Sequence, residues 1–309
     1  MIKDTIFSLK SPYRNDLNIT GYRFGEGQKS ACIVGAMRGN EVQQLYISSL
    51  LIHELTKLEA KGAIIKNHEI LVIPSINHYA MNIGKRFWAM DNTDINRMFP
   101  GYNLGETTQR IAAGIFEKIK GYTYGIQLAS FYIKGDFFPH VRMMETGYQD
   151  EQSAKNFGFK HVVLRKPKPY DTTTLNYNWQ LWNTHAYSVY TRETDQIDEV
   201  SAKEALVAIL RFLKRAGIID YKCDGGYIST VIYEDDLLTI KTQAAGIFKV
   251  LKAPGNIVRE GDVLARIFHP FEGGVISEIV APSDGRIFFV HRAPLVMENE
   301  PVFKIVRWD

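Results

Sequence analysis

The sequence has little cysteine and no long apolar run, and these absences exclude several classes of protein. Only two of the 309 residues are cysteine, Cys32 and Cys223, and they form no Cys-x-x-Cys motif. A disulfide framework and a thiolate zinc knuckle are therefore excluded, and a reducing compartment is favoured. No window reaches the roughly 18 apolar residues of a membrane span, and Asp4 interrupts the segment where a signal peptide needs an apolar core. We expect a cytoplasmic protein with no membrane partner.

Strong charge of one sign is also absent. The 37 Lys and Arg residues against 34 Asp and Glu leave a net charge of +3, with no concentrated basic patch, so a nucleic-acid partner is not expected. The content of 45% hydrophobic and 23% charged residues is that of an ordinary folded protein of one or two domains. Collagen-like, disordered and coiled-coil architectures are excluded.

Strand-like and helix-like segments alternate through the first two-thirds of the chain, which predicts an α/β sheet covered by helices. Short apolar runs rich in β-branched residues predict strands, and apolar residues at helical spacing predict helices. The predicted strands are 30–35, 69–74 and 186–191, and the predicted helices are 42–58, 107–120 and 201–216.

After Gly217 the pattern changes to short strands separated by glycine, proline and aspartate. Turn signals at such close intervals predict a small all-β barrel or sandwich. We therefore expect an α/β domain over residues 1–222 and a β domain over residues 223–309.

Polar residues gather after the second predicted strand. Asn77 and His78 follow this strand directly, and Arg86 and the segment 94–101, Asp-Ile-Asn-Arg-Met-Phe-Pro-Gly, come soon after. Ligands of open α/β sheets bind beyond the carboxyl ends of strands, and a guanidinium held by an asparagine suits bidentate recognition of a carboxylate. A capped loop that carries a surface arginine is an equally good interpretation of the composition.

Two glutamates lie at comparable places. Glu41 opens the first predicted helix, where a carboxylate also complements the helix dipole, and Glu193 follows the strand 186–191, where it is explained equally well as an exposed acid. Each acid alone favours the structural interpretation, whereas their joint placement beyond strand ends favours a site.

The order of these segments resembles the succinylglutamate desuccinylase/aspartoacylase family, relatives of the zinc carboxypeptidases. Residues 35–41, Gly-Ala-Met-Arg-Gly-Asn-Glu, resemble the family's Gly-x-x-His-Gly-x-Glu. Residues 94–101 resemble its Asp-Leu-Asn-Arg-x-Phe-Pro-Gly, and this match is the strongest single signal in the sequence. The resemblance implies a mixed sheet flanked by helices, followed by a small β-barrel of the hybrid kind shared with biotinyl and lipoyl carriers.

The resemblance also implies an activity and the residues that carry it. The family hydrolyses amide bonds in small carboxylate-bearing substrates such as N-acyl amino acids. Glu193 corresponds to the general acid/base, and a homo-oligomer is implied. The residues that correspond to substrate-binding positions are Arg86, Asn96, Arg97 and Arg142.

The family's zinc ion is held by two histidines and one glutamate, and this sequence departs from that set. Glu41 matches the glutamate, but Arg38 and Ala129 stand where the histidines are expected. One carboxylate does not retain zinc, and Arg38 brings a permanent positive charge to the place of a dication. We therefore expect zinc to be weakly bound or absent.

Two catalytic interpretations remain open. In the first, His78 and His140 form a displaced metal site with Glu41 or Glu193, although a lone histidine is more often a packed residue than a ligand. In the second, a metal-free hydrolase uses Arg38 to polarise the scissile carbonyl and Glu193 to activate water.

The third interpretation is a binding protein derived from a hydrolase. Several arginines would line one positively charged pocket for small di- or tricarboxylates or N-acyl amino acids. These arginines are Arg38, Arg86, Arg97 and Arg142. A simpler role for Arg38 is an ion pair with Glu41, three residues later.

Overall fold

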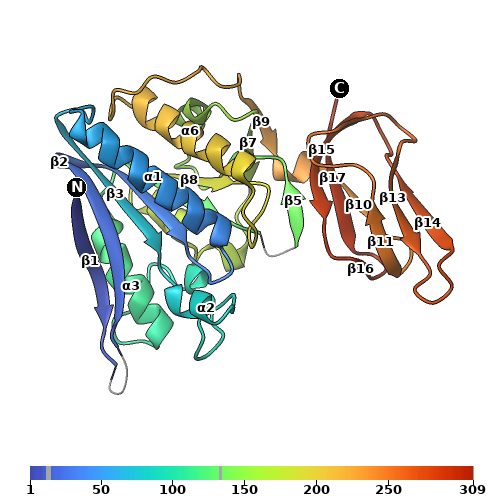
Figure 1. Cartoon of the computed structure of the whole chain (residues 1–309), viewed down its shortest axis with the longest axis horizontal. Helices are drawn as coiled ribbons and strands as arrows, with labels where there is room; N and C mark the ends of the chain where they lie inside the picture. The colour runs from blue at the N-terminus through green and yellow to red at the C-terminus, as the bar shows by residue number, and fades with distance from the viewer. Residues whose placement is uncertain (12–14, 132–133, 309) are drawn as a thin grey trace. The chain divides into compact units, whose positions relative to one another are not determined.

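An eight-stranded mixed sheet organises the larger part of the molecule (Figure 1). The computed structural model describes residues 1–11, 15–131 and 134–308. The strand order is β1-β2-β4-β8-β6-β7-β9, and β3 pairs with β2. The strands are β1 (Ile2–Leu9), β2 (Leu17–Ala36), β3 (Asn67–Ser75), β4 (Tyr124–Ala129), β6 (His140–Met144), β7 (His161–Arg165), β8 (His185–Tyr190) and β9 (Thr230–Tyr233).

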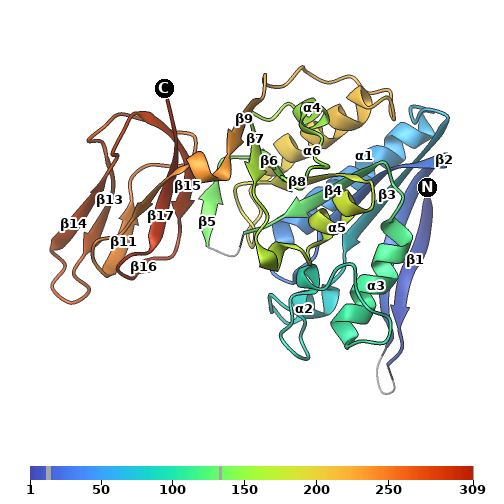
Figure 2. The ribbon, with the colours of Figure 1, turned by 180° about the vertical axis from the view of Figure 1, so that it is seen from behind.

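Helices cover both faces of this sheet. Helices α1 (Val42–Ala60) and α6 (Glu199–Arg215) lie over one face, and α3 (Thr107–Ile119) and α5 (Leu175–Leu181) lie over the other (Figure 2). Because side chains alternate along a strand, Ile33 packs into the core under α1 whereas its neighbour Val34 packs into the core under α3. Strands buried on both faces explain the continuous apolar runs in the sequence.

Strands β2, β3, β4 and β8 run parallel, so their carboxyl ends meet at one edge of the sheet. Strand β6 runs antiparallel to β8 and brings its first residue, His140, to the same edge opposite Tyr190. The segments that follow β2, β3, β4 and β8 therefore start close together. These segments contain the residues that the sequence placed beyond strand ends.

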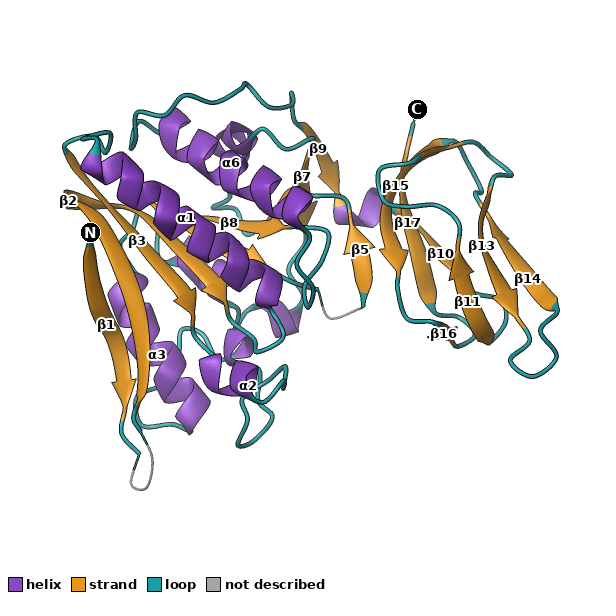
Figure 3. Ribbon diagram, viewed as in Figure 1, coloured by secondary structure: helices purple, strands orange, loops and turns teal. Residues whose placement is uncertain are grey.

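The second unit consists of two antiparallel sheets, and its only described helix is a single 3-10 turn (Glu234–Asp236) (Figure 3). One sheet has the order β10-β17-β15-β12, with β5 paired to β15, and the other has the order β14-β13-β11-β16. The two sheets share one core of buried aliphatic and aromatic side chains. The strands are β5 (Gly135–Phe137), β10 (Leu238–Lys241), β11 (Gly246–Val250), β12 (Ile257–Val258), β13 (Val263–Phe268), β14 (Val275–Val280), β15 (Gly285–His291), β16 (Leu295–Val296) and β17 (Pro301–Arg307).

The division between the units differs from the one expected at residue 222. The first unit comprises Met1–Ser130 and Pro139–Ile232, and the second comprises Phe131–Phe138 and Tyr233–Asp309. Strand β5 belongs to the second unit because Phe137 pairs with Phe289 of β15. A three-residue strand with so distant a partner has no local sequence signal.

Within the described residues, no helix combines the length and the apolar character that crossing a bilayer requires.

Candidate functional site

The turn after β2 places two charged side chains inside the protein. Gly39 has no room for a side chain, because a Cβ atom there would lie 2.2 Å from the carbonyl oxygen of Lys85. Its N–H donates to the carbonyl of Arg86 at 2.9 Å, so the turn is held against the segment that follows α2 (His78–Asn82). The neighbouring side chains of Arg38 and Glu41 are only 4% and 1% exposed.

The Glu41 carboxylate is surrounded by donors. Its Oε2 accepts from the backbone N–H groups of Met37 at 2.7 Å and Arg38 at 3.0 Å. Its Oε1 accepts from Nη1 of Arg38 at 3.0 Å and from the hydroxyl of Ser130, directly after β4. These four donors compensate for removing the carboxylate from water. The ion pair with Arg38 is the simpler arrangement that the sequence left open.

Arg38 has a second carboxylate partner, Asp94, which the sequence did not predict. Nε of Arg38 lies 3.2 Å from both Asp94 oxygens, and Nη2 lies 2.8 Å from Oδ2. Asp94 is 9% exposed, and its Oδ1 also accepts from the N–H of Asn96, in the 3-10 turn Ile95–Arg97 that Asp94 caps. The Arg38 guanidinium thus lies between two buried carboxylates from separate segments.

Asn96 and Arg97 connect this turn to the start of α5. The Asn96 Oδ1 accepts from the N–H of Leu175 at 3.3 Å. Nη1 of Arg97 donates to the carbonyl of Tyr170 at 2.6 Å and to the Asp171 carboxylate at 3.1 Å, and its Nε lies 4.0 Å from Asp94. Arg97 is 23% exposed, so solvent reaches this guanidinium far more readily than that of Arg38.

The end of β4 lies beside Glu41. The carbonyl of Ala129 accepts from Nε2 of Gln44, one helical turn after Glu41, and Ser130 donates to Glu41 itself. The end of β4 is therefore linked to Glu41 and to the first turn of α1, while the correspondence of Arg38 and Ala129 to zinc ligands stays a prediction.

Tyr190, at the end of β8, contacts both candidate residues of β6, Arg142 and His140. The Arg142 guanidinium lies 4.4 Å from the centre of the Tyr190 ring and donates to its hydroxyl. The buried His140 ring stacks on the same ring, with 5.0 Å between centroids and 3° between planes. A tyrosine between a cation and an imidazole fixes both groups in orientation.

Glu193 and Arg86 lie in the loops at this edge. Glu193 is partly buried and follows Tyr190 by three residues, and the Thr191 hydroxyl donates to its carbonyl at 3.2 Å. The Arg86 guanidinium lies 5.6 Å from the centre of the Phe87 ring. Their proposed acid/base and substrate-binding roles stay predictions.

His78, a candidate substitute metal ligand, lies in α2, where partial burial lowers the pKa of its imidazole. In the portion of the chain that the structure describes, no three His, Cys, Asp or Glu side chains are arranged to hold one metal ion. A displaced site formed by His78 and His140 stays a prediction.

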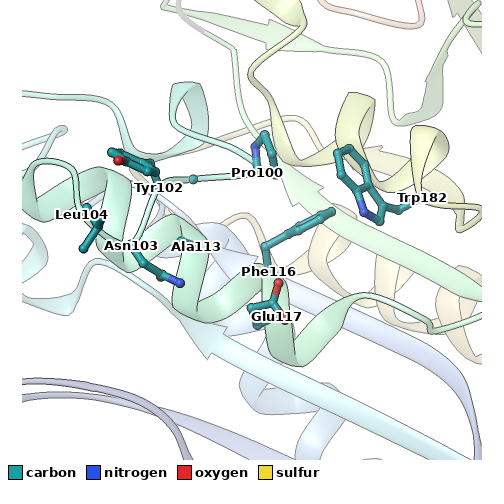
Figure 4. Close-up of a pocket in the computed structure, with 9 residues that line it drawn as sticks. Pro100, Tyr102, Asn103, Leu104, Ala113, Phe116, Glu117 and Trp182 are labelled. Atoms are coloured by element: carbon teal, nitrogen blue, oxygen red, sulfur yellow. The ribbon is translucent and has the colours of Figure 1, made fainter.

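A cavity of about 440 Å³ lies next to the Asp94-to-Gly101 motif (Figure 4). Gly101, at φ 92°, lets the chain turn onto α3, since a Cβ there would lie 2.1 Å from the backbone nitrogen of Ala113. Pro100, Phe116 and Trp182 form an aromatic-rich part of the wall. Nothing in the sequence pattern predicted this cavity, because its walls come from three segments.

Comparisons with known proteins agree on one family. The model of the succinylglutamate desuccinylase/aspartoacylase catalytic domain matches residues 27–174. The N-alpha-acetyl-L-2,4-diaminobutyric acid deacetylase of Halomonas elongata is 30% identical over 112 residues, which span 34% of this chain and only 31% of that protein.

Two crystal structures share the fold over nearly the whole chain. A succinylglutamate desuccinylase from Silicibacter sp. superposes with a TM-score of 0.79 at 18% identity, covering 98% of this chain and 92% of that one. The product-bound ectoine utilization protein EutE (DoeB) from Ruegeria pomeroyi has the same TM-score at 17% identity, covering 98% and 94%. The mixed sheet with its helices and the C-terminal antiparallel sheets thus confirm the expected fold class. Just under half of the chain, residues 27–174, thus resembles the catalytic domain of the succinylglutamate desuccinylase/aspartoacylase family in sequence, and the similarity of fold extends over nearly the whole chain.

Proposed function

We propose that this protein binds a small carboxylate-bearing molecule, of the N-acyl amino acid or di- or tricarboxylate class, without using zinc. The observation that carries the proposal is the Arg38 guanidinium between Glu41 and Asp94. A cation that belongs to the chain already neutralises the carboxylates of the site.

The residues present do not fit the zinc ion that the family implies. A carboxylate has about four lone-pair positions, and Glu41 already accepts from four donors. Ala129 offers no ligand atom in its side chain, and Arg38 is a permanent cation. The proposed function therefore involves no metal.

The remaining guanidinium groups match a carboxylate ligand. Arg97 is partly exposed and pairs with the Asp171 carboxylate. This contact fixes the position of the guanidinium while leaving it accessible to solvent. Arg142 is oriented by Tyr190. A planar guanidinium binds a carboxylate through two parallel hydrogen bonds, and pre-organised arginines lose little side-chain entropy on binding. The Halomonas relative, named for its N-acetylated amino acid, supports this ligand class.

Amide hydrolysis with Glu193 as the acid/base is the second candidate. It is favoured by the place of Glu193 after β8, at the edge where β4 also ends and β6 begins. Without a metal, Glu193 would have to activate water alone, which makes slow turnover the expectation. Hydrolysis assays on the same N-acyl amino acids, run with chelator, decide between binding and catalysis.

Replacing Arg97 by alanine is expected to weaken carboxylate binding about 10- to 100-fold, because a charge-assisted hydrogen-bond pair contributes about 1.5–3 kcal/mol. Isothermal titration with N-acetyl amino acids and dicarboxylates, in the presence of chelator, measures the affinity. Arg97→Lys keeps the charge but loses the bidentate geometry, so its affinity should lie between that of the wild type and that of Arg97→Ala. Unchanged affinity in Arg97→Ala would show that Arg97 does not bind the ligand.

A further inference from the structure

We propose that Arg38 is the resident cation of this site and a positioning residue for the ligand-binding turn Ile95–Arg97. Its guanidinium takes the place of a bound ion because it links the turn after β2 to the turn Ile95–Arg97. Its effect on ligand binding rests on the proposed function, whereas its role as an internal cation does not.

The geometry of the bridge requires a guanidinium. The edge formed by Nε and Nη2 faces the Asp94 carboxylate, and Nη1 faces Glu41 on the other side. Three nitrogens in one plane thus serve two carboxylates at once. A lysine ammonium is a compact point charge on a flexible stem and does not reproduce two such contacts in fixed directions.

The bridge continues as a series of alternating charges towards the proposed ligand. Asp94 lies between Arg38 and Arg97, at 2.8 Å and 4.0 Å, and Arg97 lies between Asp94 and Asp171. Arg165 closes the series, 3.0 Å from Asp171. Without Arg38, the Asp94 carboxylate loses the cation that lies 2.8 Å from it, while Arg97 lies 4.0 Å from the same carboxylate. We expect Arg97 to shift towards Asp94 and to bind an external carboxylate less well.

Arg23 provides a matched control at another place in the same unit. It also contacts two carboxylates, Asp4 at 3.1 Å and Glu69 at 2.9 Å. Its side chain is 22% exposed, and these partners come from β1 and β3, away from the ends of β2 and β4. Replacement of Arg23 removes the same side chain and two ion pairs without touching the bridge.

The test is chemical rescue of Arg38→Ala by free guanidinium ion. Thermal melting is recorded with millimolar guanidinium chloride, with sodium chloride of equal ionic strength as the salt control. We expect the melting temperature of Arg38→Ala to lie well below that of the wild type and to rise with guanidinium. The wild type and Arg23→Ala should show no such rise. Absence of a rise specific to Arg38→Ala would overturn the proposal.

Arg38→Lys keeps the test decisive if Arg38→Ala does not fold. Lysine restores one charge but fills the space of the guanidinium, so this variant should melt below the wild type and gain nothing from guanidinium. A melting temperature equal to that of the wild type would show that any cation suffices and would overturn the guanidinium bridge. Zinc that raises the melting temperature of the wild type would likewise contradict a resident cation.

Ligand titration separates this inference from the proposed function. At a temperature where both proteins are folded, Arg38→Ala should bind the carboxylate at least about tenfold more weakly than the wild type and recover affinity with guanidinium. Equal affinity would refute the positioning role. If the wild type binds no carboxylate, the proposed function fails, while the melting experiment still tests the internal cation.

Discussion

Arg38→Met is expected to lower the free energy of unfolding by about 3–5 kcal/mol, the cost of leaving buried charges without their partner. Methionine has a similar length, so loss of packing contributes little. Glu41 and Asp94, which are 1% and 9% exposed, would then carry like charges with no shared cation between them. Chemical denaturation, monitored through a spectroscopic signal from the first unit, measures this change in the free energy of unfolding.

A triple variant assigns the cause of this loss. If the uncompensated carboxylates are responsible, adding Glu41→Gln and Asp94→Asn to Arg38→Met should recover part of the stability, because neutral amides in the interior cost less than unpaired charges. Arg23→Met, at the more exposed ion pairs, should cost much less. A loss below about 1 kcal/mol for Arg38→Met would contradict a buried, interdependent bridge.

The double variant Arg38→His and Ala129→His is expected to gain stoichiometric zinc binding. It places two imidazoles beside Glu41, which completes a set of two histidines and one carboxylate. The apoprotein should be less stable than the wild type because the Arg38 bridge is lost. Free zinc at roughly a thousandfold above its dissociation constant should then stabilise it by about 4 kcal/mol. Elemental analysis and melting with and without zinc measure both effects.

Each single histidine variant is a control, and neither should bind zinc as tightly as the double variant. Adding Glu41→Gln to the double variant should remove most of the gained affinity. A double variant with no more zinc than the wild type would mean that positions 38 and 129 do not face one coordination centre. The contacts from Gln44 to Ala129 and from Ser130 to Glu41 support the opposite expectation.

The positions of the helices followed closely from the local pattern. The predicted helix 42–58 lies within α1, and the predicted helix 107–120 extends one residue beyond α3. Helical periodicity depends on neighbours three and four positions away, so it is visible without the fold. Strand β5 was not predictable, because its three residues gain their stability from a partner in β15.

Sequence motifs indicated several residues of the candidate site but not the connections between them. The motif 94–101 identified Asn96 and Arg97, and the turn after β2 identified Arg38 and Glu41. Sequence reasoning placed Arg38 among the groups that touch a ligand, whereas the structure places its guanidinium on two carboxylates of the chain. Asp94 lies 56 positions from Arg38, and no periodic pattern relates charges so far apart.

The sequence by itself determined the order of strands and helices, the family motifs and the departures at Arg38 and Ala129, because these depend only on residue identity and near neighbours. The tertiary structure alone decided which charges meet. Parallel strands bring the ends of β2, β4 and β8 to one edge. There Glu41 and Asp94 contact the same guanidinium, and Ser130 donates to Glu41. The electrostatic character of the site depends on distances between segments remote in sequence, which only the folded sheet establishes.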